Sequence, residues 1–350
     1  MRDSLDPGGN GFDDAGGVPV SATDSAQRTY LNPVLDCDFP DPAIVHAPDG
    51  YYYAYGTQTL RDGAWINIQV ARSLDLVSWE HLGDALPDKP AWASATQDFW
   101  APSVIFDGTT YFMYYSATPD VFHHHKRGHG LAVATSTSPA GPFVDMGKPL
   151  LLGEGFEFID PMAFDDPATG KRLLYWGSGF QPIRVQELAA DRMSFASGSE
   201  PVELIWPNGE DGAFPRLVEA AWVIRRDGFY YLFYSGDNCC GPDAEYGVMV
   251  ARSRSATGPF ETLEQATGVP NSLMLEKSDR WLAPGHNCIA EDAAGDLWIV
   301  YHAIDLERPR QHQDDEINSR RILLIDRIEW RDGWPFVGTP SDVPRPAPRT

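Results

Sequence analysis

The sequence predicts an all-β fold, a five-bladed β-propeller with four-stranded antiparallel blades. Aromatic residues make up 12% of the 350-residue chain, and there are 32 glycines and 29 prolines. Aromatic side chains favour strands, whereas glycine and proline favour turns. One strand–turn–strand pattern also recurs five times along the chain. No amphipathic pattern predicts a helical domain beside these repeats.

Each repeat consists of a turn that ends in glycine and an aromatic, β-prone run that follows it. Three of the turns are Asp-Gly, which is a strong hairpin signal. Successive repeat glycines are 58 to 67 residues apart, which leaves room for the four strands of one propeller blade. A β-sandwich with fortuitous glycine spacing is the competing interpretation, and five matched units disfavour it. The repeat glycines are Gly50, Gly108, Gly170, Gly228 and Gly295.

The composition of the chain ends differs from that of the repeats. Residues 1–29 are rich in Gly, Asp and Ser, so we expect a flexible leader before a single propeller domain at 30–339. The Pro-rich residues 340–350 are expected to form an extended tail. The leader lacks the apolar stretch of a secretory signal, which predicts a cytoplasmic protein, or a secreted one if a signal was omitted from this sequence.

The charge balance excludes several classes of partner. The chain carries 50 acidic and 27 basic residues, for a formal net charge of −23. Nucleic acids and anionic membranes both attract clustered Lys and Arg, so neither is an expected partner. No apolar run approaches the ~18 residues that a transmembrane helix needs. We expect a monomer that binds neither nucleic acid nor a membrane.

The repeat also predicts where polar residues meet. Eight to ten residues before each repeat glycine lies the start of the first strand of a blade. First strands line the axis of a propeller, so these positions should converge at one end of the central channel. An aspartate in an Asp-Pro pair is often an ordinary turn residue, but three acids at matched positions indicate a functional site. The five positions hold Asp41, Trp100, Asp160, Glu219 and His286.

The segments around these positions resemble glycoside hydrolase family 43. The resemblance runs from about Asn32 to Val337 and implies a five-bladed propeller that cleaves arabinofuranosides or xylosides with inversion. The NDPNG motif of the related β-fructosidase propellers is absent. The segments are NPVLDCDFPDPAIV (32–45), FWAPSVIF (99–106), FIDPMAF (158–164), VEAAWVIRRDGFYYLFYS (218–235) and APGHNCIAEDAAGDLWIVYHA (283–303).

The resemblance implies a role for each acid. Asp41 matches the general base, Glu219 the general acid, and Asp160 the residue that orients the acid and raises its pKa. An inverting glycosidase needs such an acid and base, roughly 6.5–9.5 Å apart, and an ionised Asp160 would disfavour the charge on Glu219. His286 matches an axial histidine beside a metal ion. Ca²⁺ that keeps some of its waters is the metal expected there, and no organic cofactor is expected.

Three residues are candidates for contact with the sugar. Trp100 is a stacking platform or, equally, a core aromatic. Arg321 precedes the strand ILLIDRIEW, where the family often places an arginine against the sugar, and a surface role is the alternative. Trp176 is the third candidate. The loops that follow the second strands should line the pocket, namely 56–65, 116–129, 177–183, 235–245 and 302–319.

Histidine and cysteine residues in these loops allow further interpretations. The loop VFHHHKRGHG (121–130) holds four histidines without the spacing of a zinc motif, and we interpret them as solvated. Metal or substrate binding is the alternative there. The four cysteines, Cys37, Cys239, Cys240 and Cys288, are expected to be free thiols, with a disulfide between the adjacent pair Cys239 and Cys240 as the alternative.

The sequence thus predicts an inverting glycoside hydrolase that acts on α-L-arabinofuranosides of plant-type oligo- or polysaccharides. β-Xylosides are the alternative substrate within the family, followed by galactofuranosides. A non-catalytic carbohydrate-binding propeller is the alternative of another class, and it predicts that at least one acid is lost. A protein-binding scaffold predicts no converging acids. All three acids are present.

Overall fold

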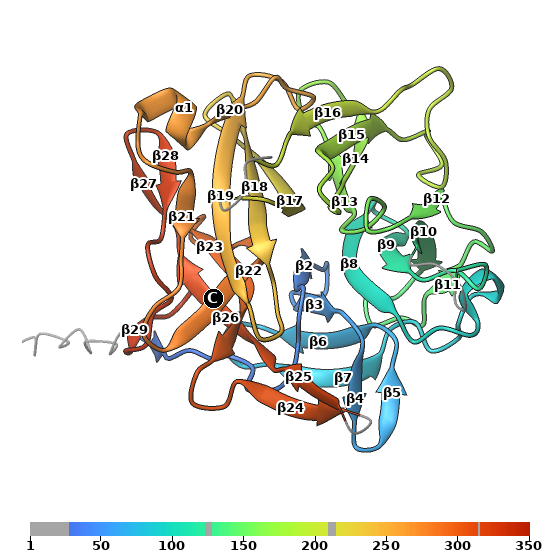
Figure 1. The fold of residues 1–350 in the computed structure, drawn as a ribbon, viewed down its shortest axis with the longest axis horizontal. Coiled ribbons are helices and arrows are strands. Elements are labelled where there is room, and N and C mark those ends of the chain that lie inside the picture. The colour runs from blue at the N-terminus through green and yellow to red at the C-terminus, as the bar shows by residue number, and fades with distance from the viewer. Residues whose placement is uncertain (1–27, 123–127, 209–214, 314–315) are drawn as a thin grey trace, which may run out of the picture.

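The computed structural model describes residues 28–122, 128–208, 215–313 and 316–350. Within this part of the chain, five antiparallel sheets surround one axis (Figure 1), which confirms the predicted five-bladed propeller. The predicted leader, residues 1–29, lies outside the described residues except for its last two positions.

Each sheet is one blade, and its strands follow chain order from the axis outward. Blade 1 consists of β2 (Ala43–His46), β3 (Tyr52–Gly56), β6 (Gln69–Ser73) and β7 (Glu80–Asp84). Blade 2 consists of β8 (Phe99–Phe106), β9 (Tyr111–Ala117), β10 (Gly128–Ser136) and β11 (Val144–Asp145), with β12 (Leu151–Glu154) also paired to β10. Blade 3 consists of β13 (Met162–Asp165), β14 (Arg172–Trp176), β15 (Ile183–Glu187) and β16 (Val202–Ile205).

The last two blades carry most of the additional elements. Blade 4 consists of β17 (Val218–Arg226), β18 (Phe229–Asn238), β19 (Glu245–Ser253) and β20 (Glu261–Thr262), with β21 (Leu273–Leu275) also paired to β19. Blade 5 consists of β22 (Trp281–Glu291), β23 (Leu297–Asp305) and β26 (Arg321–Arg327). Outside the blades lie β4 (Thr59–Arg61), β5 (Ala64–Ile66), η1 (Ala91–Ala93), α1 (Leu263–Thr267), β24 (Arg310–Gln313), β25 (Glu316–Ser319), β27 (Glu329–Arg331) and β28 (Trp334–Phe336).

The hairpin between the first two strands of every blade turns at a repeat glycine. The φ angles of these five glycines lie between 73° and 101°, a region that costs other residues strain. The recurrent glycine in the sequence is therefore a requirement of the backbone.

The first strands form a closed ring around the axis. Strand β2 contacts β8, β8 contacts β13, β13 contacts β17, β17 contacts β22, and β22 contacts β2 again. The apolar core is divided accordingly, because five of its clusters each lie between two neighbouring blades. Packing between blades therefore holds the axial ends of the first strands at fixed positions.

Both ends of the described chain close the ring. The segment before blade 1 takes the outer place in blade 5, where Leu35 pairs with Leu323 of β26. Strand β1 (Thr29–Tyr30) pairs with β29 (Arg345–Pro346). The Pro-rich segment 340–350 thus packs against the propeller through β29, and the N–H of Ala347 donates to the carbonyl of Arg28 at 2.8 Å.

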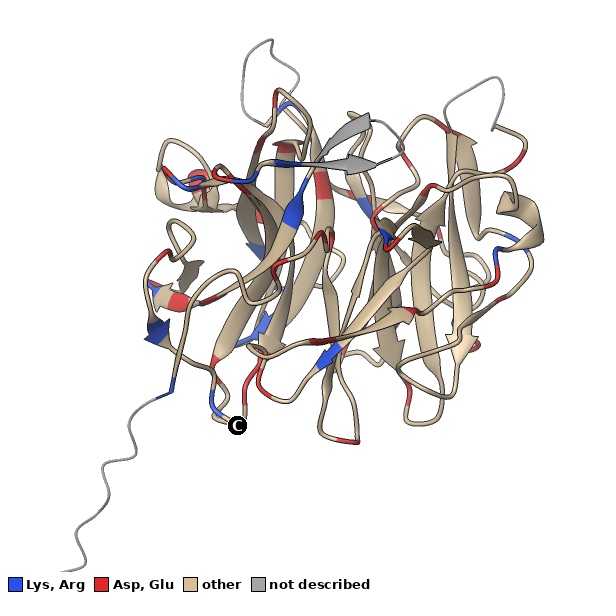
Figure 2. Ribbon diagram, turned by 90° about the horizontal axis from the view of Figure 1, so that it is seen from below, with Lys and Arg blue, Asp and Glu red and all other residues tan. Residues whose placement is uncertain are grey.

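Acidic positions are scattered over the loops and strand ends on both faces of the propeller (Figure 2). Such a distribution places most of the negative charge in contact with water. None of the helices among the described residues has the length and apolar character to span a membrane.

Candidate functional site

At one position in every blade, within the innermost strand or just before it, the backbone is in the left-handed region, and β22 has a further such residue in Ala283. The φ angles lie between 47° and 58°, where residues other than glycine are strained. In blades 1, 3 and 5 this residue is the one that the repeat predicted. In blades 2 and 4 it directly follows the predicted Trp100 and Glu219. The five residues are Asp41, Ala101, Asp160, Ala220 and His286.

A side chain of the preceding blade accepts a hydrogen bond from the backbone N–H of each kinked residue. Four of the five acceptor side chains lie at the end of the aromatic run of a second strand, either as its last residue or directly after it. Ser178 holds the equivalent position in blade 3, but its hydroxyl donates to Glu219 and does not accept a backbone N–H of a kinked residue. The bonds run from Asp41 to His302 Nδ1 (3.1 Å), from Ala101 to Thr57 Oγ1 (2.8 Å), from Asp160 to Ser116 Oγ (3.2 Å), from Ala220 to Asp160 Oδ2 (3.1 Å) and from His286 to Ser235 Oγ (2.9 Å).

A cavity of about 520 Å³ lies over this ring of kinks. The structure brings six of the seven predicted site residues together in its lining. Three of the loops that were predicted to line the pocket also contribute residues to the cavity lining. The first contributes Thr57, the second Ser178 and Phe180, and the third residues between 237 and 243. The six predicted residues are Asp41, Trp100, Asp160, Glu219, His286 and Arg321.

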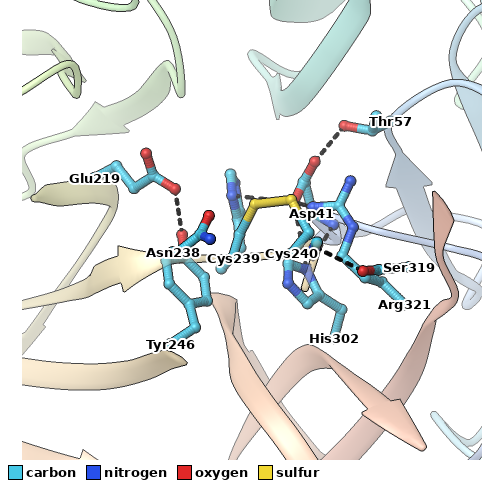
Figure 3. Close-up of a disulfide and its surroundings, with 12 residues drawn as sticks. Asp41, Thr57, Glu219, Asn238, Cys239, Cys240, Tyr246, His302, Ser319 and Arg321 are labelled. Carbon is cyan, nitrogen blue, oxygen red and sulfur yellow. Dashed lines mark hydrogen bonds and ion pairs between the residues drawn. A yellow bond between two sulfur atoms is a disulfide. The ribbon is translucent and has the colours of Figure 1, made fainter. Parts of the chain in front are cut away.

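Asp41 is a buried carboxylate surrounded by cationic and hydrogen-donating groups (Figure 3). Its Oδ2 accepts a hydrogen bond from Thr57 Oγ1 at 2.5 Å, and its Oδ1 lies 3.0 Å from Arg321 Nη1. The Nδ1 atoms of His286 and His302 are each 3.3 Å from Oδ1. Burial alone would raise the pKa of Asp41, but Arg321, the strongest of the opposing groups, outweighs it and holds the pKa well below the ordinary value. Asp41 is therefore ionised.

Glu219 has the opposite electrostatic environment. Burial raises its pKa, and the charge of Asp41 adds to the rise. Two hydroxyls oppose it, because Ser178 Oγ donates to Oε2 at 2.5 Å and Tyr246 Oη donates to Oε1 at 2.7 Å. Both oxygens of the carboxyl group are thus held in place, and the net effect still favours the protonated form (Figure 3).

Asp160 shares the electrostatic environment of Glu219. Burial and then the charge of Glu219 raise the pKa of Asp160 well above its ordinary value. Its Oδ2 accepts the N–H of Ala220, the residue next to Glu219. We expected an ionised Asp160 to raise the pKa of Glu219. In the structure burial is the largest cause of that rise, and the two carboxyls disfavour each other's ionisation.

His286 and His302 are buried imidazoles at the floor of the cavity. Burial lowers the pKa of both, that of His302 to about 4, so both are neutral near pH 7. His302 Nδ1 accepts the N–H of Asp41, which places its proton on Nε2. His286 Nδ1 faces Asp41 at 3.3 Å and Asp160 at 3.9 Å.

The Ca²⁺ expected beside His286, with waters among its ligands, stays a prediction. Among the described residues, no group of three or more His, Cys, Asp or Glu side chains is placed to hold a metal ion. The Nδ1 of His286 is turned toward two carboxylates instead, and Ca²⁺ prefers several oxygen ligands to one nitrogen. No catalytic step is therefore assigned to a metal.

Trp100 lines the cavity as part of an aromatic stack. Its ring centroid lies 4.5 Å from that of His129 and 6.3 Å from that of Phe156. His129 is buried, and its Nδ1 bonds to the carbonyl of Gly155 at 2.8 Å. Our interpretation of the loop histidines as solvated is thus wrong for His129, while His123, His124 and His125 lie outside the described residues.

Trp176 requires a correction. Its side chain is only 2% exposed and belongs to the apolar cluster between blades 2 and 3, with its ring 5.8 Å from that of Phe195. The side chains of strand β14 point between blades and not along the axis. The prediction that Trp176 contacts the sugar is therefore wrong, and the residue is part of the core.

The cysteines also differ in part from expectation. Cys37 and Cys288 are free thiols, as expected. Cys239 and Cys240 form a disulfide, so the alternative interpretation is the correct one for this pair. Both half-buried cysteines line the cavity, in the predicted loop 235–245.

The sequence reasoning missed several residues that position the predicted ones. Each shares a position with equivalents in other blades, at the end of the aromatic run of the second strand. The repeat signal lies in the glycines and aromatics of these segments, and it does not single out the polar residue beside them. The missed residues are Thr57, Ser116, Ser178, Ser235 and His302, together with Tyr246 on β19.

Comparison with known proteins agrees with this geometry. The family model of the glycosyl hydrolases family 43 matches residues 30–335. A probable arabinan endo-1,5-alpha-L-arabinosidase A of Aspergillus flavus is 29% identical over 88% of this chain and 94% of its own. A beta-D-galactofuranosidase of Aspergillus niger is 28% identical over 89% and 85%. A xylan 1,3-beta-xylosidase of a Vibrio species is 27% identical over 89% of this chain and 58% of its own.

Two solved structures have a similar fold. A thermostable family-43 glycoside hydrolase superimposes with a TM-score of 0.73 at 30% identity, over 92% of this chain and all of its own. An exo-1,5-alpha-L-arabinanase from a bovine ruminal metagenomic library gives a TM-score of 0.69 at 25% identity, over 85% of this chain and 96% of its own.

Proposed function

Because the chain belongs to the glycosyl hydrolases family 43 and is a glycoside hydrolase, we propose that it hydrolyses α-L-arabinofuranosidic bonds with inversion. Asp41 is the base and Glu219 the acid. One observation carries this assignment: two carboxyl groups in one cavity have their pKa values shifted in opposite directions. Such a divergence is what separates a base from an acid in carbohydrate hydrolysis.

The reaction is a single displacement at the anomeric carbon. The carboxylate of Asp41 takes a proton from a water molecule as its oxygen bonds to that carbon. The carboxyl group of Glu219 gives its proton to the glycosidic oxygen as the bond between carbon and oxygen breaks. Asp41 ends protonated and Glu219 ends ionised, and exchange with solvent restores both. Arg321 stabilises the ionised form of Asp41 before the reaction.

Asp160 acts on Glu219 in two ways. Its Oδ2 holds the backbone at Ala220, and so fixes the position from which the side chain of Glu219 extends. Its own carboxyl group also competes with Glu219 for ionisation, which keeps a proton on the pair. Asp160 therefore supports the protonated state of the acid.

The choice of substrate rests on the relatives. Proteins named as arabinan endo-1,5-alpha-L-arabinosidases are 29% identical to this chain over 88% of its length, so arabinan and arabino-oligosaccharides are the first choice. The relative named as a xylan 1,3-beta-xylosidase makes β-xylosides the second. The relative named as a beta-D-galactofuranosidase makes β-D-galactofuranosides the third.

An assay with three nitrophenyl glycosides and linear arabinan tests this proposal. We expect nitrophenol release from the α-L-arabinofuranoside to exceed that from the β-xyloside and the β-galactofuranoside, and Glu219→Ala to abolish hydrolysis of arabinan. If the β-xyloside is the better substrate, the xylosidase alternative is correct. Measurable binding of arabino-oligosaccharides without any hydrolysis would instead favour the non-catalytic carbohydrate-binding propeller.

A further inference from the structure

The Cys239–Cys240 disulfide lies in the wall of the active-site cavity without a part in the proposed chemistry. Figure 3 places it between Glu219 on one side and Asp41 on the other. A disulfide has no ionisable proton, so it cannot act as the acid or the base. Its contribution must come from its shape and from contact with what enters the cavity.

Two neighbouring hollows meet at this disulfide. Both cysteines line the catalytic cavity, and Cys240 also lines a second hollow of about 660 Å³. The two hollows share Thr57, Trp100 and Arg321 as well. The second one is lined by amide and carboxylate side chains and by an indole, a set that suits the hydroxyls and the apolar face of a sugar. Those residues are Gln58, Trp65, Gln97 and Asp98.

Hydrogen bonds fix the loop that carries the disulfide. The side chain of Asn238 donates to the carbonyl of Asp243 at 3.2 Å, which closes the loop on itself. The N–H of Gly241 donates to Ser319 Oγ at the end of β25 at 2.8 Å. Cys239 also packs against the apolar cluster that contains Tyr246. The two sulfur atoms are therefore a preorganised surface, which lowers the entropy cost of binding.

The residues around the disulfide in the cavity lining indicate which kind of ligand its sulfur atoms contact. The neighbours of the disulfide in the cavity lining are polar, namely Asn238, Asp237 and Asp243. Trp100 and Phe156 supply apolar surface from blade 2 and the segment after it. A furanose ring presents hydroxyls at its rim and C–H groups on its faces, so it needs apolar contacts set among polar groups.

We propose that the Cys239–Cys240 disulfide packs on the sugar unit next to the one whose bond is cleaved, at the border of the two hollows. The disulfide is thus a specificity-determining residue pair for substrates of several sugar units. This inference rests on the proposed function, and it adds that the second hollow holds a neighbouring sugar unit.

The test compares the double variant C239S/C240S with wild type. For arabinotriose we expect the KM to rise about fivefold, which corresponds to the loss of roughly 40 Å² of apolar contact. The kcat should stay within about twofold, because the disulfide takes no part in proton transfer. Cys37→Ser is the matched control, since this free thiol lines neither hollow, and it should leave both constants unchanged.

Chemical reduction provides a second measurement that does not depend on how the variant folds. A water-soluble phosphine breaks the S–S bond to two thiols and is itself oxidised to the phosphine oxide. Reduced wild type should show the same rise in KM for arabinotriose. The phosphine should have no effect on C239S/C240S.

Three outcomes would overturn a part of this account, and they differ from one another. An unchanged KM in both the variant and the reduced enzyme refutes contact with the sugar. A fall in kcat with a shifted alkaline limb of the pH profile would mean that the disulfide positions Glu219 through Tyr246 instead. Wild type that hydrolyses no arabinofuranoside at all refutes the proposed function.

Discussion

At the scale of single residues, Asp41 and Glu219 differ in what their oxygens contact. Arg321 and two imidazoles face Asp41, whereas the hydroxyls of Ser178 and Tyr246 donate to Glu219. The sequence could predict both acids because the repeat aligns them. The repeat alone does not indicate which of them holds a proton, because the partners come from strands far away in the chain, and the two roles came from the family resemblance.

Removal of either carboxyl group should abolish most activity for a different reason in each case. Asp41→Asn and Glu219→Gln should each lower kcat on arabino-oligosaccharides about 10²- to 10⁴-fold, the usual contribution of a general acid or base. A substrate with a chlorinated nitrophenol leaving group needs no protonation, so it should restore much of the rate to Glu219→Gln only. Equal rescue of Asp41→Asn would show that the two roles are assigned wrongly.

Loss of the Tyr246 hydroxyl should move the alkaline limb of the pH profile. The bond from Tyr246 to Glu219 favours the charged carboxylate and so lowers the pKa of Glu219. In Tyr246→Phe this pKa rises further, and the acid stays protonated to higher pH. The alkaline limb of kcat/KM should therefore shift upward. Tyr231→Phe, whose hydroxyl bonds to Gly333 away from the cavity, is the control, and an equal shift there would contradict the argument.

Loss of the charge on Arg321 should move the acid limb instead. Arg321 opposes the effect of burial and holds the pKa of Asp41 low. In Arg321→Met the pKa of Asp41 rises, so the base becomes protonated at a higher pH and the acid limb of kcat/KM shifts upward. Arg320→Met is a matched control, because Arg320 bonds to Asp36 and not to Asp41. An acid limb that does not move in Arg321→Met would refute the role of Arg321.

At the scale of elements, a left-handed kink lies at the cavity end of each first strand. This kink turns the site residues toward the cavity. Each kink is held by a bond to the preceding blade, so the strain is offset by packing that the whole ring provides. The repeat predicted the hairpins and the axial strands correctly. It did not predict the kinks, since Asp and His are only enriched at positive φ and Ala is not.

The bond at one kink can be removed without touching an acid. Ser235 is fully buried, and its Oγ accepts the N–H of His286. Ser235→Ala leaves that N–H without a partner and should lower the free energy of unfolding by about 1–3 kcal/mol in urea titrations. Ser255→Ala, at an exposed position, should change it by less than about 0.5 kcal/mol. Similar values for the two variants would mean that the kink bond contributes nothing.

Trp176 shows where the element-level prediction failed. Trp176 ends a second strand, and successive side chains of a strand point to opposite faces of the sheet. In a propeller both faces of each blade are covered by neighbouring blades, so Tyr175 and Trp176 are both buried. The described residues that line the cavity lie at or beside the kinks, in loops or at strand ends, as Arg321 does at the start of β26.

At the scale of the whole molecule, the two ends of the described chain meet on one side of the ring. Strand β29 pairs with β1, and the Ser341 N–H and hydroxyl join the buried network of Asn32 and Asp326. The sequence predicted an extended Pro-rich tail, and composition alone could not indicate this contact. Its partners lie some 300 residues away, so only the closed ring brings them together.

Truncation tests the importance of this closure. Removal of residues 340–350 deletes β29 and the contacts of Ser341, and should lower the Tm by roughly 5 °C in calorimetry. Removal of Thr350 alone should leave the Tm unchanged, since its side chain is exposed. If the longer truncation melts at the wild-type temperature, the tail does not help to close the propeller.

The central claim is that Asp41 and Glu219 carry out an inverting hydrolysis of arabinofuranosides. Proton NMR of the first sugar released from an α-1,5-linked arabino-oligosaccharide tests it most directly, before mutarotation mixes the anomers. With Asp41 as base and Glu219 as acid, β-L-arabinofuranose appears first and the α-anomer only later. Initial release of the α-anomer, or no release of arabinose units in either form, would contradict it.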